Sequence, residues 1–207
     1  MDLAIKLIVL LPLLAAAIAG LFCRVIGDRP AQIVTCAALL IAAALSILVF
    51  VTIGFGHEKM FVVPIASWIN SGTLEVAWSL RVDTLTAVML IVVTGVSSMV
   101  HVYSIGYMAE DPSIPRFMAY LSLFTFFMLM LVTSDNLVQL FFGWEGVGLA
   151  SYLLIGFWYD KPSANAAAIK AFIVNRIGDF GFALGIFAVW MLSGSVNFAE
   201  IFAKAPE

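Results

Sequence analysis

The sequence predicts an all-α membrane protein, a multi-pass bundle of about six transmembrane helices with a short surface hairpin between the second and third. Of its 207 residues, 63% are hydrophobic and 11% are charged, whereas soluble domains carry about 25% charged residues. The apolar residues gather in runs of about 20, the length at which a helix crosses a bilayer. A soluble core of this size could not bury so much apolar surface.

Residues 1–56 contain the first two predicted spans, at 3–26 and 31–55. The first run is long, little positive charge precedes it, and no convincing small-residue cleavage site follows it, so it differs from a signal peptide. We therefore expect a true membrane span there. Pro30 and Gly56 bound the second window.

Residues 57–82 differ from their neighbours because they mix charged residues with a turn signal at 70–72. After this turn, apolar side chains recur at every second position, which is the period of a β-strand. The pattern predicts a short interfacial hairpin, with Trp68 and Trp78 at the level of the lipid headgroups.

Residues 83–193 contain four further predicted spans, at 85–108, 117–133, 137–158 and 164–192. Asp83 is the expected N-cap of the first of these helices. A polar segment separates that helix from the next, and a very short turn at 134–136 joins the following pair. We expect residues 194–207 to form a short polar tail without another span.

The basic residues near the helix ends indicate the orientation. Arg24, Arg29, Arg116 and Lys161 fall on one face, and Lys6, Lys59, Arg81 and Lys204 on the other, two of them in the longer hairpin segment. We expect the first loop to be cytoplasmic and the N-terminus to be outside. The alanine-rich composition favours a bacterial plasma membrane over a mitochondrial inner membrane.

Several function classes lack support in the sequence. A net charge of −3 without a basic patch argues against nucleic-acid binding. Cys23 and Cys36 have no neighbouring cysteine or histidine cluster, and His57 is isolated, so no metal or haem ligand set is predicted. Neither of the glycine-rich nucleotide-binding motifs is present. We expect no metal and no cofactor in this chain.

Glu145 lies in the middle of an apolar helix, where a carboxylate costs about 2.5–3.5 kcal/mol on insertion scales. Gly143, Gly146 and Gly148 surround it and offer close approach to a neighbouring helix. Gly148 and Tyr152 share its face, which suits a helix–helix contact or a hydrated cavity rather than lipid. Such a carboxylate indicates an ion or proton path. The alternative is a protonated carboxyl that only bonds a neighbour.

The predicted sixth span carries four polar residues, Lys170, Asn175, Arg176 and Asp179. Arg176 and Asp179 are three positions apart and can pair on one helix face. They either support an ion path or only stabilise the bundle. Lys170 lies nearer a helix end and can extend toward the interface.

His101 lies within a stripe of hydroxyl residues on the third span, with Thr94, Ser97 or Ser98, and Ser104. This spacing marks one helical face. The stripe could support a file of water for proton transfer. The alternative is a histidine that is satisfied by a hydrogen bond between helices.

Three runs, at 80–108, 116–158 and 166–179, resemble a known family, and GWEGVGLASYLLIGFW at 143–158 is the most specific of their motifs. The resemblance is to the antiporter-like subunit of proton-translocating NADH-quinone oxidoreductase, respiratory complex I, called chain L in bacteria and chain 5 in mitochondria. The large subunits of multisubunit sodium/proton antiporters are related to that family, so a weaker resemblance to them is expected.

The resemblance implies that Glu145 is a proton-path carboxylate acting with a lysine on a later helix. It implies that Arg176 and Asp179 belong to the path or support it. NADH, flavin, iron–sulfur clusters and quinone would bind partner subunits of the enzyme. The implied partners of this chain are other membrane-arm subunits of complex I, the lipid bilayer and protons.

The chain stops before the helix that should carry the lysine, so it resembles about the first third of such a subunit. We expect a fragment, or a chain that a partner completes, and no transport by this chain alone. Two alternatives remain: a subunit of a sodium/proton antiporter, and a structural membrane segment whose polar residues only pack helices.

Overall fold

A computed structural model describes residues 1–56, 60–72 and 74–205, so His57 and Lys59 lie outside the described residues. Within these ranges, six helices are long and apolar enough to cross a membrane, which confirms the predicted fold class. They are α1 (Asp2–Leu21), α3 (Asp28–Phe55), α4 (Thr84–Tyr107), α5 (Ile114–Val132), α6 (Leu137–Ile155) and α7 (Pro162–Ser193).

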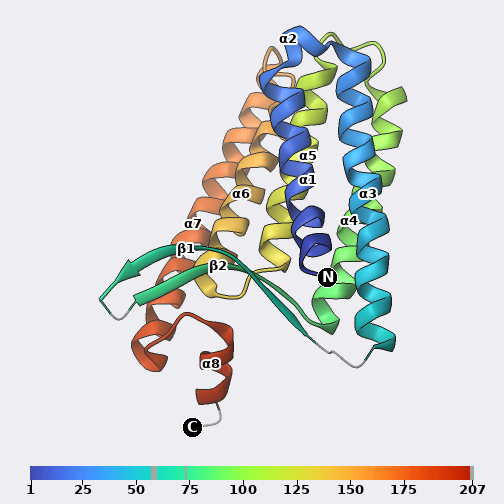
Figure 1. Ribbon diagram of the computed structural model, residues 1–207. Helices are drawn as coiled ribbons and strands as arrows, with labels where there is room; N and C mark the ends of the chain where they lie inside the picture. Colours follow the sequence, from blue (N-terminus) through green and yellow to red (C-terminus); the bar gives the residue numbers. More distant parts are fainter. Residues whose placement is uncertain (57–59, 73, 206–207) are drawn as a thin grey trace.

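Four of these helices, α1, α3, α4 and α5, pack around one another, with α6 against α5 and α7 against α6 (Figure 1). Close approach in membranes depends on small side chains, and Ala19, Ala31 and Ala119 meet where α1, α3 and α5 come together. Helix α7 lies at the edge of this bundle, and much of its apolar surface is exposed.

The first span is shorter than the sequence predicts. Helix α1 ends at Leu21, and a one-turn helix, α2 (Cys23–Ile26), follows it. Gly27 then turns the chain with a φ of 76°, a conformation that glycine adopts without steric cost. The turn at Gly27 separates α2 from α3 and ends the apolar run.

The predicted hairpin is present within the expected range, 57–82. Its strands, β1 (Phe61–Ser71) and β2 (Leu74–Val82), pair in antiparallel fashion. The rings of Trp68 and Trp78 are tilted by 43° with their centres 5.0 Å apart. Both meet Phe142 of α6, at 5.8 and 5.0 Å between ring centres. These rings hold the hairpin against α6 in addition to any contact with headgroups.

The hairpin, the connector between α5 and α6, and the C-terminal segment join at one end of the bundle (Figure 1). Arg81 N donates to Thr133 O at 2.8 Å, and Leu137 N donates to Val196 O at 3.0 Å. The segment expected as a plain polar tail therefore docks here and forms a short helix, α8 (Phe198–Lys204). Local sequence gave no signal because the pairing joins distant positions.

Candidate functional site

Two glycines bring α6 into close contact with α5. A Cβ on Gly143 would lie 2.6 Å from the backbone nitrogen of Leu131, and a Cβ on Gly146 would overlap the ring of Phe127. Only glycine allows an approach this close. Glu145 lies between these two positions in the sequence and reaches away from them toward α7.

Arg176 is the centre of a polar cluster between α6 and α7. Its Nη1 donates a hydrogen bond to Glu145 Oε2 and lies 3.6 Å from Asp179 Oδ2. Asp179 Oδ1 accepts a hydrogen bond from Trp144 Nε1 at 2.7 Å. The side chain of Asp179 is 7% exposed, against 23% for Glu145. One guanidinium, which stays charged in proteins, is therefore shared by two carboxylates.

The cluster lines an open cavity of about 590 Å³ among α5, α6 and α7. Ser151 and Asn175 add polar groups to its lining, and Phe124 and Met128 of α5 form an apolar wall. A Cβ on Gly148 would meet nothing within 4 Å. Of the two expectations for this face, a helix contact or a hydrated cavity, Gly148 fits the cavity. A space of this volume, with charged and polar groups along one side, has room for several waters.

Lys170 does not join this cluster. Its side chain is exposed on α7, nearly two helical turns before Arg176. Among the described residues, the ion pairs are made by Arg81 and Arg176, and none involves Lys170. Its role in a proton path therefore stays a prediction.

His101 belongs to a second polar cluster, between α4 and α5, and is fully buried. Its Nδ1 lies 2.8 Å from the carbonyl oxygen of Ser97, and its Nε2 lies 3.0 Å from Ser122 Oγ. A carbonyl only accepts, so Nδ1 carries the proton and Nε2 accepts from the Ser122 hydroxyl. The hydroxyls of Ser97 and Thr125 are 2.6 Å apart and add a second bond between the helices.

Ser122 and Thr125 are not among the residues predicted from the sequence. Their three-residue spacing places them on one face of α5, and this signal could have found them. The geometry favours the hydrogen-bonded account of His101, because both ring nitrogens already have partners.

The chemistry open to these clusters is the handling of protons and charge. Glu145 and Asp179 can bind and release protons, whereas the arginine between them cannot. Within the described ranges, no three histidine, cysteine, aspartate or glutamate side chains gather in a way that would hold a metal ion. Cys23 and Cys36 are both free thiols.

Comparison with known proteins identifies the family. Residues 68–118 match the family model described as NADH-Ubiquinone oxidoreductase (complex I), chain 5 N-terminus, and residues 134–206 match NADH:quinone oxidoreductase/Mrp antiporter, TM. NADH-quinone oxidoreductase subunit L of Rhodobacter capsulatus is 56% identical over 97% of this chain. The chain belongs to the subunit L (chain 5) family of complex I.

Other members of the subunit L family are similar to a comparable degree. Subunit L of Rickettsia conorii is 52% identical and chain 5 of Triticum aestivum 54% identical, each over 96% of this chain. The chain spans 29% of the Rhodobacter capsulatus protein and 30% of each of these two. It is a multi-pass membrane protein. Its bacterial relatives are consistent with the predicted plasma membrane, although chain 5 relatives are also close.

Two solved structures of membrane complexes contain a chain with a fold similar to that of this subunit L family member. A chain of the archaeal membrane-bound sulfane sulfur reductase has a TM-score of 0.84 over 99% of this chain and 40% of its own length, at 18% identity, and shows the fold alone. A chain of the Mrp complex from Dietzia has a TM-score of 0.78 at 25% identity, over 95% of this chain and 20% of its own length.

Proposed function

We propose that this chain forms part of the membrane arm of a proton-translocating NADH-quinone oxidoreductase, in which Glu145 carries protons within the membrane. The names of the relatives support the enzyme. The observation that carries the role of Glu145 is its place on a membrane helix, where it pairs with Arg176 beside a cavity large enough for several waters. In this proposal NADH, flavin, iron–sulfur clusters and quinone bind partner subunits.

The shared arginine supplies a means of changing the charge on Glu145. Two unit charges about 4 Å apart interact by about 4 kcal/mol at an effective dielectric of about 20, and about 1.4 kcal/mol is a tenfold change in proton occupancy. A small movement of Arg176 toward Asp179 would remove much of this interaction from Glu145. The lysine that the family places on a later helix would compete with Arg176 for the same carboxylate.

Two predicted residues keep supporting roles in the proposal. Lys170 is exposed on α7, where it is available to neighbouring helices or to the interface. His101 joins α4 to α5 through Ser122. This bond helps to hold α5, the helix against which α6 packs.

The test is Glu145→Gln in the full-length subunit within the assembled enzyme. Glutamine keeps the shape but neither carries charge nor exchanges a proton, so we expect NADH-driven proton pumping to fall at least about tenfold while the complex still assembles. Glu75→Gln is the matched control, because Glu75 is exposed on β2. Normal pumping by the Glu145 variant would contradict the proposal.

The second candidate is a subunit of a sodium/proton antiporter. The family model over residues 134–206 includes Mrp antiporters, and the Mrp complex shares the fold. Sodium-driven proton exchange without NADH oxidation, sensitive to Glu145→Gln, would favour this candidate. Loss of assembly with unchanged pumping in the complexes that do form would favour a structural role.

A further inference from the structure

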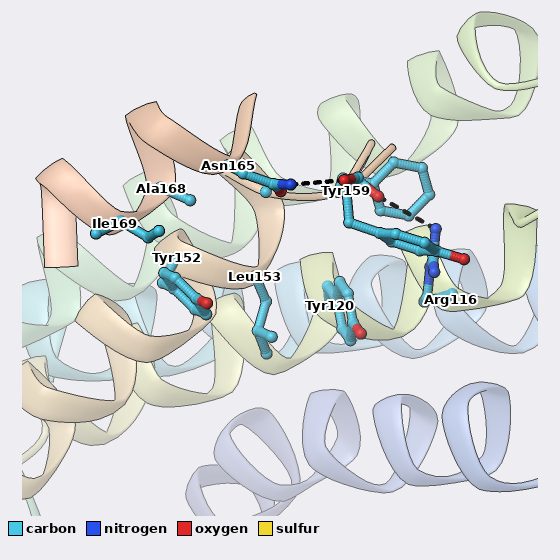
Figure 2. A pocket seen from close by; sticks show the side chains of 10 residues that line it. Arg116, Tyr120, Tyr152, Leu153, Tyr159, Asn165, Ala168 and Ile169 are labelled. Carbon is cyan, nitrogen blue, oxygen red and sulfur yellow. Dashed lines mark hydrogen bonds between the residues drawn. The ribbon is translucent and has the colours of Figure 1, made fainter. Parts of the chain in front are cut away.

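A second cavity lies at the end of the bundle away from the hairpin, where α5 and α7 begin and α6 ends (Figure 2). Its volume is about 360 Å³. The polar part of its lining comes from Arg116, Tyr120, Tyr152 and Asn165, which lie on three different helices. None of these residues takes part in the proton path proposed above.

Arg116 is held in a fixed position at the edge of this cavity. Its Nη2 donates to the carbonyl oxygen of Phe157 at 3.2 Å. Its guanidinium carbon lies 4.5 Å from the ring centre of Phe157. It lies 5.0 Å from the ring centre of Tyr159, which is beside Arg116 in Figure 2. Such stacking restrains a planar guanidinium and leaves its edge free for a ligand.

The charge of Arg116 has no anion among the described residues. The ion pairs found there involve other arginines. Its Nε is buried and has no hydrogen-bond partner within the same ranges. A buried, unpaired donor on a charged group is costly, so a site of this kind calls for an acceptor from outside the described residues.

We propose that this cavity binds the phosphate group of an anionic phospholipid. Arginine matches phosphate through several N–H donors at once, and the phenols of Tyr120 and Tyr152 are further donors. The site lies at the ends of membrane helices, where headgroups lie, and basic pockets between such helices bind anionic headgroups. Lys161, which lies over the ring of Trp158 at 4.5 Å, offsets the charge of Asp160 in the α6–α7 loop.

Native mass spectrometry of the purified chain in detergent, with equal amounts of phosphatidylglycerol and phosphatidylcholine added, tests this site. We expect preferential retention of phosphatidylglycerol. Arg116→Gln should lower its affinity about tenfold, as the loss of one charge-assisted hydrogen bond does. Arg29→Gln, at an exposed arginine on the same membrane face, should leave the affinity unchanged. Equal losses in the two variants, or no lipid preference in the wild type, would overturn the proposal.

Two further arms keep the result clear. Tyr152→Phe removes one hydroxyl and keeps the ring, so it should lower the affinity for phosphatidylglycerol about threefold. This variant tests the site even if Arg116→Gln fails to fold. Inorganic phosphate at millimolar excess should not displace the lipid. Displacement by phosphate alone would assign the site to a free anion and contradict the proposal that it binds a lipid.

Discussion

Arg176 carries one charge between two carboxylates, and the balance between them depends on a single indole. Trp144 donates to Asp179 at 2.7 Å, which satisfies part of that carboxylate and leaves Arg176 nearer to Glu145. Hydrogen bonds to a charged group contribute about 1.5–3 kcal/mol. The free energy of the bond from the Trp144 indole is therefore large enough to decide which carboxylate pairs with Arg176.

The variant Trp144→Phe tests this balance at the residue scale. Phenylalanine keeps a ring against Phe182, 5.7 Å away in the wild type, but cannot donate. We expect Asp179 to draw Arg176 away from Glu145 and proton pumping to fall about threefold to tenfold, less than in Glu145→Gln. Trp158→Phe is the control, because its indole bonds Asp111 outside this cluster. Equal effects of the two variants on proton pumping would contradict this role of the Trp144 indole.

At the scale of elements, the glycines of α6 have different structural roles. Gly143 and Gly146 allow α6 to touch α5, whereas Gly148 opens the cavity beside Glu145. The glycine pattern in the sequence predicted close approach, but for the face that Gly148 shares with Glu145 it left open a helix contact or a hydrated cavity. Sequence spacing alone cannot separate a contact from a cavity, because both require a missing side chain.

Gly143→Ala should weaken the contact between α5 and α6. The added methyl would lie 2.6 Å from backbone of Leu131, and backbone cannot yield as a flexible side chain can. We expect a loss of about 1–3 kcal/mol, the usual cost of overpacking, measured by thermal unfolding in detergent. Gly148→Ala, with open space around the new Cβ, should be near neutral. A Gly143 variant as stable as the Gly148 variant would contradict the contact.

At the scale of the whole molecule, one end of the bundle is fastened by a junction of segments far apart in the sequence. Asp135 lies in this junction, in the connector outside the membrane helices, and accepts a hydrogen bond from Ser79 Oγ at 3.1 Å. Burial raises the pKa of Asp135 above its usual 3.8, while the Ser79 bond and the charge of Arg81 oppose this shift.

A raised pKa means that the folded state holds this proton more tightly than the unfolded state does. The contribution of Asp135 to stability is therefore greatest at low pH and is lost as the pH rises from 3.8 through the folded pKa. We expect Asp135→Asn to flatten this part of the dependence of stability on pH. Unfolding monitored by tryptophan fluorescence at a series of pH values measures it. Asp160→Asn, at an exposed site on the opposite end, should keep the wild-type slope, and an unchanged slope in the Asp135 variant would refute the assignment.

The sequence by itself determined the spans, the hairpin and the position of Glu145 within a membrane helix. Hydropathy and alternation are properties of neighbouring residues, and a carboxylate in an apolar run is conspicuous without any structure. Only the tertiary structure decided that Arg176 joins Glu145 as well as Asp179, that Ser122 satisfies His101, and that the last segment docks on the α5–α6 connector. The new partners are far apart in the sequence, so they depend on how the helices and loops pack and leave no local pattern.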